Sequence, residues 1–126
     1  EGMVLIIGGA HQGKLDYARD AFSLTEEEIC SCSGGEPDFS RRCIYGIEEF
    51  VLSCLRQGVD PKEVFQRNRA LWQNSILICR DIFSGVVPVD AELRRWRQTT
   101  GQLCRYLAGE ASQVSRIFCG LEQRLK

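Results

Sequence analysis

The residues best suited to chemistry in this sequence are seven consecutive ones that match the pattern Gly-x-x-x-x-Gly-Lys. They are Gly8, Gly9, Ala10, His11, Gln12, Gly13 and Lys14. Glycines at these positions let successive backbone N–H groups surround an anion, and the lysine adds a positive charge. The pattern therefore predicts a phosphate-binding loop and a nucleotide ligand, ATP or GTP.

The segments on either side of this loop favour the same interpretation. Met3 to Ile7 is an aliphatic run that is typical of a parallel strand buried on both faces. A helix is expected from about Lys14 to Phe22, because Leu15, Ala18 and Phe22 fall on one stripe. A strand, a glycine-rich turn and a helix are the context in which the motif holds phosphate at a helix N-terminus. The alternative is a glycine-rich turn that binds nothing.

One position departs from the motif. Leu15 follows Lys14, where a Ser or Thr would ordinarily ligate Mg²⁺. Backbone amides bind phosphate without this ligand, but metal-assisted phosphoryl transfer is expected to be weak. Asp81, just beyond the expected strand from Ser75 to Cys79, is the candidate Mg²⁺ ligand and catalytic carboxylate. A carboxylate at that place can equally cap a backbone or pair with an arginine.

Other strands and helices are expected to alternate along the chain. A weaker strand is expected over Glu28 to Cys32 and a last strand over Val114 to Cys119. Apolar repeats and capping residues predict helices at Ile47 to Leu55, Pro61 to Trp72 and Asp90 to Leu107. This alternation predicts an α/β fold with three layers and a mainly parallel sheet. Leu71 and Leu93 are among the residues expected to face inward.

Composition restricts the class of protein. The 126 residues have room for one domain, residues 1–126, and a formal charge of −1 offers no field to attract nucleic acid or an anionic membrane. The apolar runs are shorter than the roughly 20 residues that span a bilayer. Glu1-Gly2 ahead of Met3 is typical of residues added by an expression vector, and a cytoplasmic location is expected.

The seven cysteines are scattered and contain no Cys-x-x-Cys pair. Most are expected to be reduced structural thiols, including Cys119 beside a buried strand. Cys30 and Cys32, with Cys43 nearby, are the one group that could hold a metal, although the usual histidine partners are missing.

Two segments resemble the adenosylcobinamide kinase/adenosylcobinamide-phosphate guanylyltransferase family of cobalamin biosynthesis. Ile6 to Lys14, IIGGAHQGK, is similar to the family's first strand and GGxxSGKS loop. The second segment is Ile78 to Lys126, in which Gly85 to Pro88 is similar to the family's NEVGxGxVP loop, and about half of the chain is covered. The resemblance implies a P-loop NTPase-like fold, a transferase acting as kinase and nucleotidyltransferase, a corrinoid substrate and ring-like homo-oligomers.

The departures from this family fall on polar positions. Arg80-Asp81 stands where the family has Asn-Glu, and Arg97-Gln98 where it has Arg-Asp. The central region is shorter, and the histidine that carries guanylate in the family has no counterpart in it. The only histidine is His11. By the resemblance, Lys14 and Asp81 are the candidate catalytic residues and Arg97 the candidate substrate contact.

The sequence is therefore interpreted as a shortened, divergent member of this family that binds a nucleotide and has lost guanylyl transfer. Two alternatives remain open. One is an active cobinamide kinase whose Mg²⁺ is held by Asp81. The other is a non-catalytic regulatory or structural subunit of the cobalamin pathway. Neither a nucleic acid nor a membrane is expected as a partner.

Overall fold

Six strands form one sheet in the computed structural model, which describes residues 2–8, 13–33, 35–80 and 90–126. Their order across the sheet is β2-β3-β4-β1-β5-β6. The strands are β1 (Val4–Gly8), β2 (Ile29–Ser31), β3 (Cys43–Tyr45), β4 (Ile76–Arg80), β5 (Gln113–Phe118) and β6 (Leu121–Arg124). All neighbours are parallel except β5 and β6, which form an antiparallel hairpin. The expected α/β fold with a mainly parallel sheet is confirmed.

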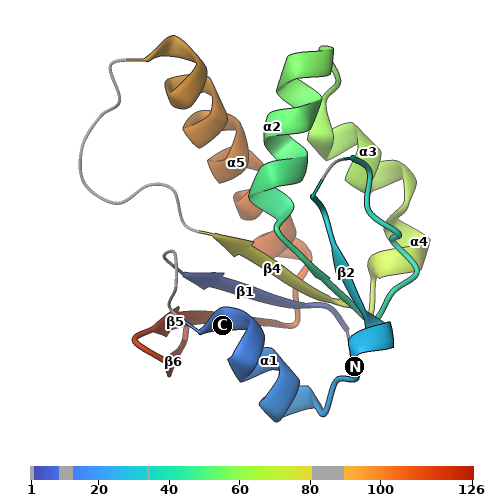
Figure 1. Ribbon diagram of the computed structural model, residues 1–126, viewed down its shortest axis with the longest axis vertical. Helices are drawn as coiled ribbons and strands as arrows, with labels where there is room; N and C mark the ends of the chain where they lie inside the picture. Colours follow the sequence, from blue (N-terminus) through green and yellow to red (C-terminus); the bar gives the residue numbers. More distant parts are fainter. Residues whose placement is uncertain (1, 9–12, 34, 81–89) are drawn as a thin grey trace.

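Helices cover both faces of this sheet (Figure 1). They are α1 (Lys14–Phe22), the short 3₁₀ helix η1 (Glu26–Glu28), α2 (Ile47–Gln57), α3 (Pro61–Arg67), α4 (Arg69–Trp72) and α5 (Ala91–Glu110). Figure 1 shows α1 on one side of the sheet and α2, α3 and α5 on the other. No helix within the described residues combines the length and the apolar character needed to cross a membrane.

The alternation of side chains along β1 explains why both faces are covered. Val4 and Ile6 belong to the apolar cluster on the α1 side, which also contains Ala18 of α1. Leu5 points the other way, into the larger cluster that contains Leu107 of α5. Successive side chains of a strand point to opposite faces, so a continuous apolar run needs a cover on each. Placing β1 in the middle of the sheet supplies both.

Most of the predicted helix ends are confirmed. The Asp60 carboxylate accepts the Lys62 N–H at 3.0 Å at the start of α3, and the Asp90 carboxylate accepts the Glu92 N–H at 2.8 Å at the start of α5. Gly58 ends α2 in the left-handed region, with φ 71°.

The segment expected to be one helix from Pro61 to Trp72 is two helices. Asn68 ends α3, and its side-chain amide donates to the Val64 carbonyl at 2.8 Å. Because of this break, the residues of α4 do not continue the helical repeat of α3. Trp72 is buried, whereas Leu71 is 54% exposed. The inward position expected for Leu71 is therefore wrong. The inward position expected for Leu93 is also wrong, because this side chain is 43% exposed in the first turn of α5.

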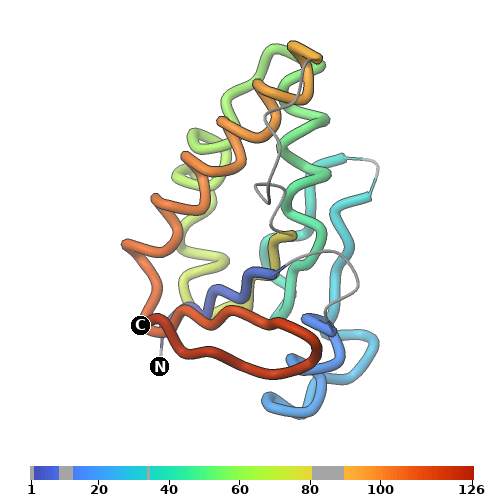
Figure 2. Tube along the Cα trace, turned by 90° about the vertical axis from the view of Figure 1, so that its left-hand side faces the viewer, coloured from blue at the N-terminus to red at the C-terminus, as the bar shows by residue number. Residues whose placement is uncertain are grey.

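The polar C-terminal tail forms a strand that the sequence did not indicate. Cys119 and Gly120 have φ values of 52° and 76° and join β5 to β6, as a two-residue turn of type I′ requires. The hairpin lies at the edge of the sheet (Figure 2). Cys119 is exposed on this turn, so its expected burial is a further correction.

Candidate functional site

The two ends of the predicted phosphate loop lie together at the carboxyl end of β1. A β-carbon built on Gly8 would lie 3.3 Å from both Cγ and Cδ of Lys14 and 2.5 Å from the Ile117 carbonyl oxygen. The stem of Lys14 therefore crosses the end of the strand, and only glycine fits beneath it. Gly9, Ala10, His11 and Gln12, the predicted middle of the loop, lie outside the described residues.

Gly13 turns the chain into α1. It is the N-cap residue, with φ 84° and ψ 23°, and its carbonyl accepts the Tyr17 N–H at 2.9 Å. This left-handed conformation is costly for a residue with a β-carbon. Glycine also has no side chain to cap the first N–H groups of the helix. The N-terminus of α1 therefore has no side-chain cap from Gly13, and it directs the positive end of the helix dipole toward the carboxyl end of β1.

A second helix begins in the same way close by. The N-cap of α2 is Gly46, with φ 79° and ψ 28°. Both helix starts border one cavity of about 420 Å³, whose described lining residues are Gly13, Lys14, Leu15, Asp16, Arg19, Ser31, Tyr45, Gly46, Glu48, Glu49, Ile78 and Arg80. Two glycine-capped helix ends thus face the same space, an arrangement suited to an anion.

The cavity lies where the direction of the chain reverses between neighbouring strands. The chain leaves β1 through α1 toward β2, and it leaves β4 through α5 toward β5 on the opposite side of β1. Gly8 and Arg80 are register partners at the ends of β1 and β4. In open parallel sheets, the crevice outside the carboxyl ends of such a strand pair is the usual ligand site.

Glu48 connects three of the elements that surround the cavity. It lies in the first turn of α2 and is only 7% exposed. Its carboxylate accepts the Arg80 backbone N–H at 2.8 Å, and its carbonyl accepts the indole N–H of Trp96 at 2.7 Å. The Arg80 guanidinium lies 5.9 Å from the centre of the Trp96 ring. The start of α2, the end of β4 and α5 are thereby held together.

The sequence analysis did not select Glu48, Gly46 or Trp96. A signal was present for Glu48, because a carboxylate at position 48 interrupts an apolar helix stripe between Ile47 and Val51. A charged residue on an inward face needs a partner, and here that partner is the backbone of β4.

The charges around the cavity are mixed. Positive charge comes from Lys14, Arg19 and Arg80, and negative charge comes from Asp16, Glu48 and Glu49. The Arg19 guanidinium forms ion pairs with two carboxylates, that of Asp16 at 3.5 Å and that of Glu26 at 2.9 Å. Its buried Nε has no hydrogen-bond acceptor in the described part of the chain. The cationic side chains Lys14, Arg19 and Arg80 can assist an anion bound in the cavity.

The described residues do not fit the Mg²⁺ site of a complete phosphate-loop motif. Leu15 lines the cavity and packs into the cluster between α1 and the sheet, and its methyl groups cannot ligate a metal. Among residues 2–8, 13–33, 35–80 and 90–126, no group of three or more His, Cys, Asp or Glu side chains is placed to hold a metal ion. Asp81, the predicted ligand, lies outside these ranges.

The remaining predicted residues lie elsewhere. Arg97 is half-buried on α5 and is not among the described residues that line the cavity. Cys32 is buried, and burial raises the pKa of its thiol well above the usual value. The Cys30 sulfur accepts the Asp38 N–H at 3.4 Å. An adjoining cavity of about 490 Å³ lies between α2 and α5, and Glu49 borders both cavities.

Comparison of the chain with protein-family models gives no match, and comparison with curated proteins gives none either.

Proposed function

We propose that this chain binds a nucleoside triphosphate, ATP or GTP, with its phosphates held by the loop from Gly8 to Lys14 and the N-terminus of α1. The observation that carries the proposal is the close approach of the two ends of this segment, where the Lys14 stem lies against Gly8 and Gly13 opens the helix. A lysine held in this way can place its ammonium group near phosphates that contact the first helical N–H groups.

The surroundings support the same ligand. The second helix start at Gly46 adds donors on the far side of the cavity, and the volume of about 420 Å³ lies within the range of small-molecule sites. The carboxylates of Glu48 and Glu49 leave less room for a second anionic group deeper in the cavity. We therefore place the phosphates at the α1 end, beside Lys14.

The proposed fold within the α/β class is that of a P-loop NTPase, and the proposed relationship is to the cobinamide kinase/guanylyltransferase family. Leu15 supplies no Mg²⁺ ligand, so phosphoryl transfer is expected to be weak or lost. The segment from Ser23 to Gln73 contains no histidine to carry guanylate, so guanylyl transfer is expected to be lost. The corrinoid substrate, the homo-oligomer and the cytoplasmic location stay predictions from the sequence.

Calorimetric titration of the purified chain with ATP and with GTP tests this proposal. Each titration is run with Mg²⁺ and with a chelator. Saturable binding in the chelator supports a site made of backbone amides and Lys14. Binding that needs Mg²⁺ would instead favour the kinase alternative, with Asp81 as the ligand. Absence of binding under both conditions would show that the proposal is wrong.

Incubation with α-labelled GTP and Mg²⁺, followed by denaturation, tests the loss of guanylyl transfer. No acid-labile label is expected on the chain. Label that disappears in the His11→Ala variant would contradict this expectation, because it would identify His11 as the group that carries guanylate.

A further inference from the structure

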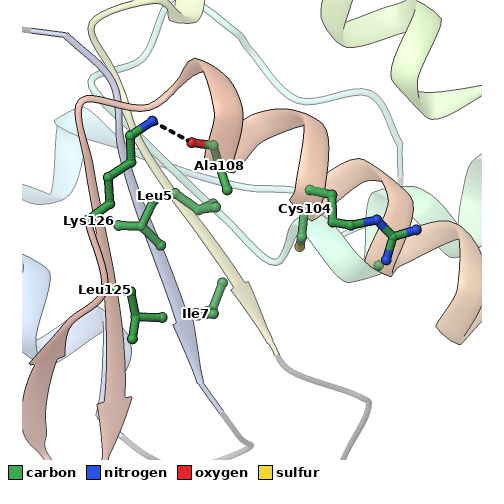
Figure 3. Close-up of a pocket in the computed structure, with 9 residues that line it drawn as sticks. Leu5, Ile7, Cys104, Ala108, Leu125 and Lys126 are labelled. Atoms are coloured by element: carbon green, nitrogen blue, oxygen red, sulfur yellow. Dashed lines mark hydrogen bonds between the residues drawn. The ribbon is translucent and has the colours of Figure 1, made fainter.

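Strand β6 is the last strand of the sheet, and its outer side is open. It pairs with β5 and with no other strand among the described residues. The end of the strand is held in place, because the Leu125 N–H donates to the Val114 carbonyl at 2.8 Å. The Lys126 ammonium, next along the chain, donates to the Ala108 carbonyl of α5 at 2.9 Å (Figure 3). An ordered strand with an unpaired row of N–H and C=O groups is a template for another strand.

Three large apolar side chains are exposed beside this edge. Phe118 and Leu121, on either side of the hairpin turn, are 65% and 73% exposed, and Leu125 is 52% exposed. Leu125 also borders an apolar cavity of about 430 Å³ between β1 and α5 (Figure 3). All three share a face of the sheet with Val114, whose side chain packs in the cluster on the α5 side. Exposed apolar surface gathered at one place marks a contact with another molecule.

Alternation along the strand determines which backbone groups of β6 point outward. Leu125 bonds to β5, and every second residue of an antiparallel strand does so. Leu121 and Gln123 therefore direct their N–H and C=O groups toward β5, whereas Glu122 and Arg124 direct theirs away from the sheet. Within β6, a further antiparallel strand can bond only to Glu122 and Arg124.

We propose that β6 pairs in antiparallel fashion with β6 of a second copy of this chain, about a two-fold axis at Gln123. Glu122 of each copy then lies opposite Arg124 of the other, and Leu121 lies opposite Leu125. The two neighbouring registers that also satisfy the backbone place Glu122 opposite itself or Arg124 opposite itself. Opposite charges across a strand pair stabilise it, and like charges destabilise it. The sequence Leu-Glu-Gln-Arg-Leu is therefore complementary to itself in one register.

The two charged side chains share the other face of the sheet. Ile117, the register partner of Glu122, belongs to the cluster on the α1 side. The Glu122 carboxylate accepts the Ser115 hydroxyl at 2.7 Å, and the Arg124 Nε donates to the Lys126 carbonyl at 3.0 Å. A carboxylate can accept several hydrogen bonds and a guanidinium can donate several, so these bonds leave capacity for the pair between copies.

The proposed interface is closed. A two-fold pairing joins two six-stranded sheets into one continuous sheet and covers the open edge of both copies. By itself it gives a dimer, not the ring that the family resemblance implies. No residue of β6 is among the described residues that line the proposed phosphate cavity, so the dimer does not depend on a nucleotide.

Sedimentation velocity with charge-reversal variants tests the proposal. The parent is expected to show a monomer–dimer equilibrium as its concentration rises. Glu122→Arg or Arg124→Glu should weaken the dimer by about tenfold or more, because two favourable pairs become two unfavourable ones. An equimolar mixture of these two variants should form a heterodimer, since every opposing pair again has opposite charges. The double variant that carries both reversals should form a homodimer again.

Cross-linking at the axis tests the register without changing a charge. Cα atoms of a directly opposed, non-hydrogen-bonded pair lie about 4.5 Å apart, within the range of about 4.4–6.8 Å that a disulfide spans. In a Cys119→Ser background, which removes the exposed thiol of the turn, Gln123→Cys should give a disulfide-linked dimer on mild oxidation. Leu121→Cys in the same background is the matched control and should cross-link poorly, because position 121 does not oppose itself.

Three results would show that the proposal is wrong. The first is a parent that sediments as a monomer at every concentration up to the millimolar range. The second is a mixture of Glu122→Arg and Arg124→Glu that associates no better than either variant alone, although circular dichroism shows both to be folded. The third is a Leu121→Cys variant that cross-links as readily as Gln123→Cys.

Discussion

The Glu48 carboxylate accepts a hydrogen bond from the Arg80 backbone N–H at 2.8 Å, so the first turn of α2 is fastened to the end of β4. Replacing Glu48 by Ala leaves this part-buried N–H without its acceptor. The expected loss is about 1–3 kcal/mol of unfolding free energy. Glu48→Gln keeps an acceptor oxygen and is expected to lose less than half as much. Urea denaturation of the three proteins measures both effects, and equal losses in the two variants would contradict the role of this hydrogen bond.

Gly8 has no room for a side chain. The β-carbon of a Gly8→Ala variant would lie 2.5 Å from the Ile117 carbonyl oxygen, and the backbone of β5 would have to move. The expected destabilisation is about 1–3 kcal/mol. Gly109→Ala is the matched control, because a β-carbon there meets nothing within 4 Å and the residue lies inside α5. That variant is expected to gain about 0.5–1 kcal/mol. Thermal unfolding should give the lowest melting temperature for Gly8→Ala, a higher one for the parent and the highest for Gly109→Ala. A Gly109→Ala variant less stable than the parent would contradict the packing described.

The buried thiol of Cys54 makes stability depend on alkaline pH. Burial raises its pKa from the ordinary value of 9.0 to about 11, so the folded state retains a proton that the unfolded chain loses. The stabilisation is complete below pH 9.0 and declines as pH rises toward about 11, by at most about 1.4 kcal/mol per pH unit. Cys54→Ala lacks this contribution. Urea denaturation across that interval should show a steeper decline for the parent, and parallel curves would contradict the assignment.

Leu15 governs the expected response to magnesium. The affinity of the parent for ATP should change little when Mg²⁺ is replaced by a chelator, since the residue after Lys14 offers no ligand. Leu15→Ser should increase the dependence on Mg²⁺. Leu15→Ala removes the same packing against the sheet without adding a hydroxyl, and it should behave as the parent does. Equal Mg²⁺ dependence in the Ser and Ala variants would contradict this reading of the motif.

The sequence contained most of the fold. The aliphatic run of β1 and the capping aspartates Asp60 and Asp90 are local signals, and each is found where it was predicted. Strand β3 was missed because its three residues are too short for an alternating pattern. Strand β6 was missed because Cys119-Gly120 is an unusual pair for a tight hairpin turn.

The candidate site could be predicted only in part. Gly8, Gly13 and Lys14 are neighbours in sequence, so their pattern is visible before folding. Gly46 and Glu48 reach the same cavity only because β3 pairs with β4, and that pairing depends on contacts between distant segments. The apolar pattern of α2 can mark Glu48 as a buried carboxylate, but it does not identify the strand that Glu48 contacts. Arg97 was selected from a family pattern, whereas Arg80, among the described residues that line the cavity, was not selected.

Titration of the Lys14→Ala variant with ATP and GTP is the most direct test of the proposed phosphate site. Loss of a charged hydrogen bond to phosphate costs about 1.5–3 kcal/mol, so the affinity should fall by about tenfold to a hundredfold. Lys62→Ala is the matched control, because it removes the same charge from α3, where the Lys62 ammonium lies over the Tyr106 ring at 5.4 Å. The account predicts that Lys62→Ala binds as the parent does. If Lys14→Ala binds as tightly as Lys62→Ala, the loop from Gly8 to Lys14 is only a turn and does not hold phosphate.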